Sequence, residues 1–266
     1  MYETKYHRAG SVAEAASMAA GADEGKYLSG GQTLIPTMKQ RLAAPSDLID
    51  LSKIADMSGV SVSGSTVKIG AATTHAEVAG NAELASACGA VADLASHIGD
   101  PAVRHKGTIG GSIANNDPAA DYPAAMVALG ATIHTNNRQI SADDFFTGMF
   151  ETALEDDEIV TAVEFEAPGK AAYSKFPNPA SRYAMAGVFV AQAGDGSVRV
   201  GVTGAGSDGV FRHGGMEEAL SGNFSADAVD GTSVSEGDML SDIHGDAAYR
   251  ANLVKVMAKR AVAAAG

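Results

Sequence analysis

Cysteine is almost absent from this chain of 266 residues, in which Cys88 is the only one. One thiol cannot form an internal disulfide, hold an iron–sulfur cluster or complete a structural zinc site. Cys88 lies in an alanine-rich stretch with a helical pattern, so we expect a small buried side chain rather than a catalytic thiol. Any metal-cluster chemistry connected with this protein must therefore reside on another polypeptide.

Positive charge and long apolar runs are also scarce. The chain has 19 Lys and Arg against 32 Asp and Glu, which gives a net charge of −13. This balance argues against nucleic acid as a partner, because phosphate backbones are bound by basic patches. No run approaches the roughly 18 consecutive apolar residues of a membrane-spanning helix, and residues 1–5 lack the apolar core of an export signal. We therefore expect a cytoplasmic protein with no transmembrane segment.

Glycine, in contrast, is abundant and concentrated in two segments, Ser29–Thr33 and Gly107–Ser112. Glycine permits positive φ, so that successive backbone N–H groups can converge on an anion. Either segment alone could be only a tight turn. Together, two such amide nests predict one ligand with two phosphates held from both sides, which is a dinucleotide. Since the chain is acidic, backbone dipoles would supply most of the attraction.

Neither segment is a standard nucleotide motif. The chain has no G-x-x-x-x-G-K-[ST] and no G-x-G-x-x-G between a strand and a helix, so a P-loop and a Rossmann site are both disfavoured. The first segment joins an expected strand at 26–28 to an expected helix at 34–39, whose dipole would favour an anion. The second opens a stretch, 99–121, without periodicity. Long irregular segments in compact domains are usually functional, so we expect 99–121 to form rigid walls of the site.

The remaining pattern alternates helices and strands. A capping-box spacing at Ser11 and Glu14 opens a helix to about residue 20, and Asp121 can cap a helix that ends at Gly130. The other expected elements are a strand at 48–51, hairpins at 60–69 and 132–140, helices at 74–80, 82–88 and 89–97, a strand at 159–165, a meander at 183–203 and a helix at 246–265. A boundary is expected at 169–170.

The stretch from Gly99 to Pro123 (GDPAVRHKGTIGGSIANNDPAADYP) and the loop from Ser29 to Pro36 (SGGQTLIP) resemble the medium, FAD-binding subunit of the molybdenum hydroxylases. Within this family the chain looks most like the carbon monoxide dehydrogenase branch, and the resemblance covers nearly its whole length. It implies an α+β fold: a two-lobed FAD-binding domain, with lobes at 1–55 and 56–169, followed by a C-terminal α+β domain at 170–266 with an antiparallel sheet and helices. In the family the two loops bracket the FAD pyrophosphate.

The resemblance also implies a set of cofactor-binding residues. Asp121 matches an acid that hydrogen-bonds the cofactor, and the backbone near Val160 matches a position beside the flavin ring. Tyr183 is a candidate to cover one face of the ring, and Lys175 falls near a cationic FAD contact. The full set is Ser29, Gly30, Gly31, Gln32, Thr33, Thr108, Ile109, Gly110, Gly111, Ser112, Asp121, Val160, Lys175 and Tyr183.

Simpler interpretations of these residues stay open. Asp121 could be only a helix cap, Tyr183 an ordinary strand aromatic, and Lys175 a solvated surface lysine. His75, His97 and His105 lack metal-ligand spacing, so we expect them to be structural or exposed. No residue is expected to be catalytic or to bind metal. We also expect that replacing Gly110 and Gly111 by valine would remove bound FAD by blocking the amides, while folding persists.

The function that the resemblance implies is electron transfer through non-covalently bound FAD. Electrons would come from a small [2Fe–2S] subunit, originate at a molybdopterin centre on a large subunit and leave to an external acceptor. The complex would be a dimer of heterotrimers, cytoplasmic or attached to the inner face of the membrane, and this chain would not oxidise the substrate alone. Two alternatives remain: a free-standing FAD oxidase or dehydrogenase, and an assembly subunit that has lost FAD.

Overall fold

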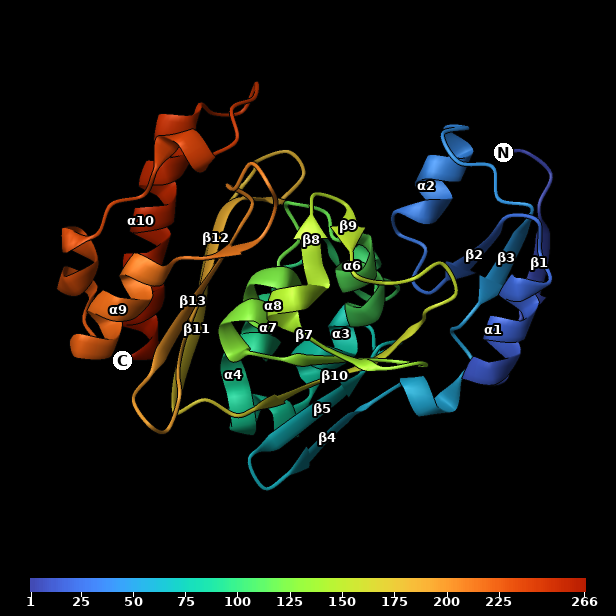
Figure 1. Ribbon diagram of the computed structural model, residues 1–266, viewed down its shortest axis with the longest axis horizontal. Helices are drawn as coiled ribbons and strands as arrows, with labels where there is room; N and C mark the ends of the chain where they lie inside the picture. The colour runs from blue at the N-terminus through green and yellow to red at the C-terminus, as the bar shows by residue number, and fades with distance from the viewer.

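The computed structural model describes residues 1–266 and has three main sheets that follow one another along its longest axis (Figure 1). The first sheet is parallel, in the order β1 (Lys5–Arg8), β3 (Asp47–Asp50), β2 (Gly25–Leu28). All four residues of the central strand β3 are buried, as expected for a parallel strand covered on both faces. The helices of this lobe are α1 (Val12–Ala20) and α2 (Leu34–Lys39), and the 3-10 helix η1 (Ala55–Met57) follows β3.

The second sheet is antiparallel and has the strand order β4-β5-β10-β6-β7. Among the helices between β5 and β6 in the chain, α4 and α6 pack on this sheet, and α4 and α7 also contact the third sheet. A small hairpin of β8 and β9 stands beside α6. The elements are β4 (Val60–Ser63), β5 (Thr66–Gly70), α3 (His75–Gly80), α4 (Ala82–Ser96), α5 (Pro101–Arg104), α6 (Ile109–Asn115), α7 (Tyr122–Leu129), β6 (Thr132–Thr135), β7 (Gln139–Ser141), α8 (Ala142–Phe145), β8 (Phe146–Gly148), β9 (Glu151–Thr152) and β10 (Val160–Glu166).

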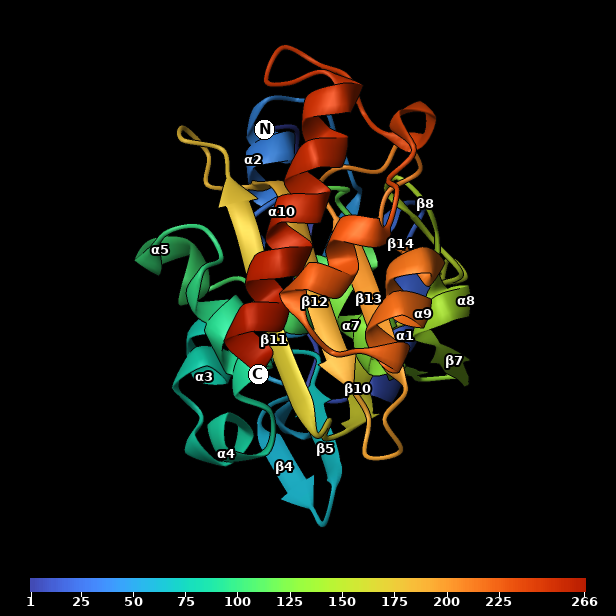
Figure 2. The same cartoon turned by 90° about the vertical axis from the view of Figure 1, so that its left-hand side faces the viewer.

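The third sheet is antiparallel, in the order β11-β12-β13-β14. The long helix α10 crosses one face of it (Figure 2), and α7 packs against the other. Strand β12 is buried at every position except its last, because it is covered on both faces. The elements are β11 (Lys170–Pro177), β12 (Ala184–Gln192), β13 (Val198–Thr203), β14 (Phe211–Arg212), α9 (Gly214–Gly222), η2 (Ala226–Gly231), η3 (Glu236–Asp238) and α10 (Ala247–Ala265).

Two hydrophobic clusters hold these layers together. The larger one runs from α1 through the second sheet to Tyr173 and Phe189 of the third sheet. The smaller one fills the space between the third sheet and α10. Because the larger cluster crosses residue 170, the division into 1–55, 56–169 and 170–266 stays a prediction, although each main sheet lies within one of these segments. None of the helices combines the length and the apolar content needed to cross a membrane.

Most of the predicted elements are confirmed to within a few residues, and one disagreement concerns the site. The stretch 99–121 is not irregular, because it contains the short helices α5 and α6. Each begins at a side-chain cap: Asp100 accepts from the Val103 N–H, and Thr108 accepts from the Gly111 N–H. These helices have four and seven residues, too few to produce an amphipathic pattern.

Helix α4 explains why two helices were expected over 82–97. It consists of two helical segments that meet at a kink at Cys88, whose φ of −152° and ψ of 78° are not helical. Burial raises the pKa of the Cys88 thiol to about 11, so the thiol is inert at neutral pH, as predicted. Asp121 does precede helix α7, but its side chain makes no capping hydrogen bond, so the prediction of a helix cap is wrong.

Candidate dinucleotide site

A cleft of about 550 Å³ lies where the first lobe meets the second. Ligand sites for small molecules and cofactors usually have volumes in this range. Its walls come from residues 25–34, from parts of the segments 98–121 and 154–160, and from residues 181–183, together with Leu51, Met57, Ala71 and His75. All the residues predicted to bind the cofactor line this cleft except Ile109 and Lys175. Ile109 is fully buried, since its side chain belongs to the hydrophobic core.

The first glycine loop has the unpaired N–H groups that the predicted amide nest requires. Every backbone N–H from Ser29 to Leu34 lacks an acceptor within the chain. Gly31 has a φ of +68°, and Thr33 at the start of α2 makes no side-chain cap. A row of unpaired N–H groups beside a helix N-terminus attracts an anion. This loop can therefore hold phosphate oxygens without any basic side chain.

The second glycine segment has a different structure, and the prediction of a second free amide nest is wrong. Most of its backbone N–H groups are used: Gly107 donates to Val103 O, Ile109 to Thr73 O, Gly110 to Ala71 O, and Gly111 and Ser112 to Thr108, which leaves only the Thr108 N–H without an acceptor. Gly110 and Gly111 are helical and have no positive φ. What this segment offers a ligand is the small surface of Gly111 and the hydroxyl of Ser112, which forms no hydrogen bond within the chain.

The glycines serve mainly to bring segments of backbone together. A Cβ on Gly30 would lie 2.2 Å from Lys106 O and 2.6 Å from the Cα of Gly107. A Cβ on Gly110 would lie 2.5 Å from the Cβ of Ala71. No real Cβ approaches other atoms so closely, so only glycine fits at either position. The two glycine segments therefore touch and form one continuous wall of the cleft.

Asp121 is a buried carboxylate of the cleft. The residue is 4% exposed, and its carboxylate accepts a 2.5 Å hydrogen bond from the Tyr173 hydroxyl. The Lys175 ammonium lies 3.0 Å from both carboxylate oxygens, and it also donates to His97 O at 2.9 Å. Burial raises the pKa of Asp121, while Lys175 and Tyr173 oppose that rise. Since the side chain of Lys175 is only 7% exposed, the alternative of a solvated surface lysine is wrong.

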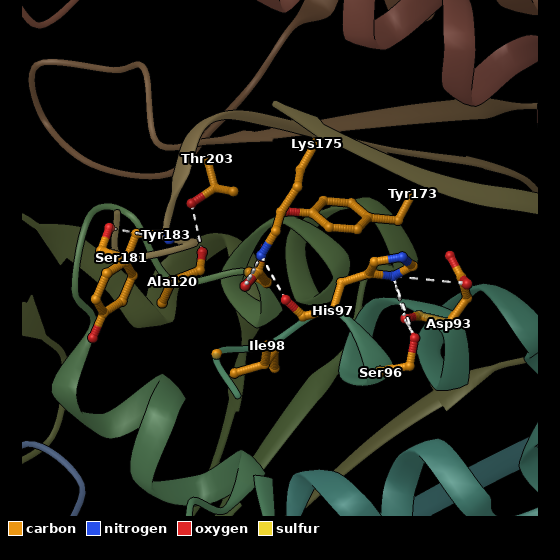
Figure 3. A network of polar contacts seen from close by, with 12 residues as sticks. Asp93, Ser96, His97, Ile98, Ala120, Tyr173, Lys175, Ser181, Tyr183 and Thr203 are labelled. Carbon is orange, nitrogen blue, oxygen red and sulfur yellow. Dashed lines mark hydrogen bonds and ion pairs between the residues drawn. The ribbon is translucent and has the colours of Figure 1, made fainter. Parts of the chain in front are cut away.

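The backbone that leads to Asp121 is fixed by the third sheet. Thr203 of β13 donates from its hydroxyl to Ala120 O at 2.6 Å, and Gly204 N donates to Pro118 O at 2.8 Å. Figure 3 shows Thr203 above Ala120, on the same side as Lys175. The C-terminal sheet thus determines where Asp121 stands in a cleft formed mainly by the first two lobes.

Tyr183 lies at the mouth of the cleft, in the turn before β12, and is 50% exposed. Its turn is held by Asn178, whose side chain accepts from Ala180 N and Ser181 N and whose carbonyl accepts from Arg182 N. Tyr183 is therefore not a strand residue, which removes that simpler interpretation. Val160 begins β10 and is buried against the cleft.

Several lining residues escaped the sequence analysis. His75 is one: it is buried, its Nδ1 has no hydrogen-bond partner, and burial together with the charge of Arg104 lowers its pKa to about 4. No pattern in the sequence marks it. Asn115 and Asp117 also line the cleft, and they could have been found because they lie within the motif quoted above. No group of three or more His, Cys, Asp or Glu side chains is placed to hold a metal ion.

These residues fit FAD. The nest of unpaired N–H groups matches a pyrophosphate, and Asp121 offers a carboxylate to a hydrogen-bond donor. Apolar side chains such as Leu28, Leu154 and Ile159 line the rest of the cleft, where aromatic rings can pack.

Comparison with known proteins identifies relatives over the whole chain. Residues 2–167 match the family described as FAD binding domain in molybdopterin dehydrogenase. The chain is 34% identical to the carbon monoxide dehydrogenase medium chain of Hydrogenophaga pseudoflava, over 98% of this chain and 96% of that relative. It is 32% identical to the nicotine 6-hydroxylase medium subunit of Paenarthrobacter nicotinovorans, over 98% and 97%.

Solved structures agree with this similarity. One chain in the crystal structure of the cyanide-inactivated Cu,Mo-CO dehydrogenase superimposes with a TM-score of 0.90 at 33% identity, covering 100% of this chain and 98% of that one. A chain of quinoline 2-oxidoreductase from Pseudomonas putida 86 gives a TM-score of 0.88 at 25% identity, covering 99% and 96%.

Proposed function

Because the chain belongs to the family of FAD-binding medium subunits of molybdenum hydroxylases, we propose that it carries electrons between two other components of such a complex. Bound FAD supplies the redox chemistry, since a flavin accepts electrons one at a time and can release two together. The observation that carries the proposal is the row of unpaired N–H groups from Ser29 to Leu34 at the wall of the cleft.

The chain's own residues bind and orient the cofactor. The amides of the first loop hold the pyrophosphate oxygens, and the hydroxyl of Ser112 adds a donor from the opposite segment. Asp121 accepts a hydrogen bond from the cofactor, while the backbone at Val160 and the side chain of Tyr183 flank the flavin ring. Tyr183 also limits the access of water, because it lies at the mouth of the cleft.

We infer the partner subunits from the family and from the single cysteine of this chain, which cannot hold an iron–sulfur cluster. A small [2Fe–2S] subunit delivers electrons that originate at the molybdopterin centre of a large subunit, and an external acceptor takes them from the flavin. We propose carbon monoxide as the substrate, because two of the relatives are carbon monoxide dehydrogenase medium chains with 34% and 33% identity. The whole assembly is a cytoplasmic dimer of heterotrimers. The nicotine 6-hydroxylase medium subunit is nearly as similar in sequence to this chain, so the partner large subunit decides between these substrates.

The cofactor site is tested by two matched glycine substitutions. Gly31 and Gly64 both have positive φ (+68° and +62°), but only Gly31 lines the cleft, and nothing lies within 4 Å of a Cβ at Gly64. We expect Gly31→Ala to weaken FAD binding about tenfold or more, since strain displaces the N–H groups, and Gly64→Ala to leave it unchanged. Both measurements use titration of the FAD-free chain followed by flavin fluorescence. Equal affinity of the two variants would exclude the first loop as the phosphate site.

The two alternative functions give different outcomes. A free-standing oxidase would turn over an organic substrate without other subunits. An assembly subunit that has lost FAD would stay colourless when mixed with excess FAD. For the proposed function, the reconstituted chain shows a flavin spectrum, has no turnover with carbon monoxide alone and forms a complex with an iron–sulfur partner.

A further inference from the structure

Lys175 has no hydrogen-bonding capacity left for a ligand. An ammonium group has three N–H donors, and the Nζ of Lys175 makes three contacts: with the two carboxylate oxygens of Asp121 and with His97 O. The side chain is 7% exposed and does not line the cleft. A direct contact between Lys175 and a bound cofactor is therefore inconsistent with this geometry.

The Asp121 carboxylate, in contrast, can accept a further hydrogen bond. Its Oδ1 accepts from both Tyr173 and Lys175, while its Oδ2 accepts only from Lys175. A carboxylate oxygen can accept two hydrogen bonds, so Oδ2 has room for one more. Asp121 lines the cleft, and Tyr173 and Lys175 stand behind it on β11 of the third sheet.

Without its partners, a buried carboxylate would take up a proton. Asp121 is 4% exposed, and burial favours the neutral form of an acid. The other titratable groups around it provide no second cation at hydrogen-bond distance: Tyr122 is a neutral phenol, and the ring of His97 bonds Asp93 O instead. Lys175 is thus the one ammonium that keeps Asp121 ionised, and Tyr173 fixes the carboxylate's orientation.

We propose that Lys175 and Tyr173 are positioning residues, which hold Asp121 as an ionised acceptor with Oδ2 available to the cofactor and set FAD affinity without touching FAD. The proposal rests on the proposed function for the identity of the ligand. It assigns the C-terminal sheet a role in binding, because β11 determines the charge state of a residue in the cleft. It also explains why a lysine is buried at this position.

The first test needs no cofactor. The full chain is prepared free of FAD as wild type, Lys175→Met and the double variant Lys175→Met/Asp121→Asn, and protonated carboxyl groups are detected by infrared spectroscopy at pH 7. We expect a new protonated carboxyl band in Lys175→Met that is absent from wild type and from the double variant. We also expect the double variant to melt at a higher temperature than Lys175→Met, because it lacks the unpaired carboxyl group. No new band in Lys175→Met would overturn the proposal.

The second test separates action through Asp121 from direct contact. FAD is titrated into Lys175→Met, Asp121→Asn, Tyr173→Phe and the double variant. We expect Lys175→Met to weaken binding about tenfold, the scale of one hydrogen bond to a charged group, and the double variant to bind no more weakly than Asp121→Asn alone. A tenfold loss that persists when Lys175→Met is added to Asp121→Asn would show that Lys175 contacts FAD itself, which would also overturn the proposal.

The two tests distinguish this proposal from the proposed function. If wild-type chain fails to bind FAD, the proposed function fails, while the infrared and melting measurements still judge whether Lys175 keeps Asp121 ionised. If wild type binds FAD and Asp121→Asn binds equally well, Asp121 is no acceptor for the cofactor. In that case the positioning role is overturned and the flavin site remains.

Discussion

The hydroxyl groups of Ser29 and Thr108 lie 2.8 Å apart, within hydrogen-bond distance although 79 residues of chain separate them. Thr108 Oγ1 also accepts from Gly111 N and so caps helix α6. One side chain therefore fixes the start of α6 and joins it to the amide nest. The position of the unpaired N–H groups relative to the rest of the cleft depends on this contact.

We predict different losses when each of these hydroxyls is removed. Thr108→Val loses a helix cap and the contact with Ser29, and it should lower the free energy of unfolding by about 1–2 kcal/mol. Ser29→Ala loses only the contact and should lower it by about 0.5–1 kcal/mol. Urea unfolding measures both. Because the contact holds the nest in place, both variants should also bind FAD several-fold more weakly.

A cap far from the cleft is the control for these variants. Ser141 accepts from Asp144 N at the start of α8 and does not line the cleft. Ser141→Ala should therefore lose stability and keep wild-type affinity for FAD. If Ser141→Ala and Thr108→Val weakened FAD binding equally, the effect would come from general destabilisation.

Alanine at Gly110 should destabilise the fold, whereas alanine at Gly111 should weaken FAD binding. A Cβ at Gly110 would meet the Cβ of Ala71 at 2.5 Å and its carbonyl oxygen at 2.7 Å, so we expect Gly110→Ala to destabilise the fold by about 2–3 kcal/mol. A Cβ at Gly111 meets first the hydroxyl of Thr108 at 3.0 Å and then the Cβ of Ser29 at 3.7 Å. Alanine also favours a helix more than glycine does, so Gly111→Ala should be nearly neutral in stability while weakening FAD binding. Thermal melts and FAD titration of the same samples test both statements.

The opposite pattern would contradict this assignment. If Gly110→Ala folded normally and only lost FAD, Gly110 would face the ligand, as the sequence analysis expected. If Gly111→Ala kept full affinity, the start of α6 would lie away from the cofactor.

The sequence was informative about the site where residues adjacent in the chain act together. The loop from Ser29 to Thr33 forms a nest because its glycine, its short strand and its helix are all local features. The segment Gly107–Ser112 has similar composition, yet its glycines permit contact with Ala71 and with the first loop. Composition alone cannot distinguish a glycine that exposes amides from one that lets two backbones touch.

Contacts between residues far apart in the sequence could not be predicted from local sequence patterns. Lys175 pairs with Asp121 across 54 residues, so nothing near either residue predicts that the lysine is buried. His75 similarly looks like an ordinary helix residue until Gly107 and Tyr122 are packed around it. The helices and strands that were predicted, in contrast, follow from local caps and alternation and agree with the structure, whereas β1, β11 and α9 were not predicted.

His75 should make the protein less stable in mild acid. Its folded-state pKa is lowered to about 4, while an unfolded chain protonates this residue near 6.5. As the pH falls from 6.5 toward 4, only the unfolded state gains the proton, so the free energy of unfolding should fall by roughly 2 kcal/mol between pH 6.5 and pH 5. Phenylalanine cannot be protonated, so His75→Phe should remove this part of the pH dependence of stability. Urea unfolding at pH 7, 6 and 5 measures how the free energy of unfolding changes with pH in wild type and in His75→Phe. The same change in both proteins would rule out His75 as the cause.

Cys88 should resist thiol reagents in the native state. It is 4% exposed, and burial raises its pKa to about 11, so almost no thiolate exists at pH 8. A disulfide reagent such as dithionitrobenzoate should label no thiol in the folded chain and one thiol in 6 M urea. Rapid labelling under native conditions would mean that α4 opens at its kink. Cys88→Ala supplies the blank, and it should bind FAD like wild type because Cys88 does not line the cleft.

Glu158 should also make the protein less stable in acid, but over a lower pH range than His75. Its carboxylate is held by Arg138 through two hydrogen bonds of 2.8 and 2.9 Å, and it also accepts from Thr135 and from Glu155 N. These contacts, that with Arg138 foremost, lower its pKa to about 2 from an ordinary value of 4.5. The stabilisation is therefore complete above about pH 4.5 and is lost as the pH falls toward 2, because the unfolded chain protonates first.

Glu158→Gln keeps the shape of the side chain and removes its charge, so it should lower the melting temperature by several degrees at pH 7. The gap from wild type should narrow as the pH falls below 4.5. Lys259→Met breaks the exposed ion pair with Asp230 and is the matched control, since a solvated pair contributes little and the melting temperature should hardly change. A gap between Glu158→Gln and wild type that stays constant from pH 7 to pH 3 would mean that packing, and not the ionised carboxylate, stabilises this side of the cleft.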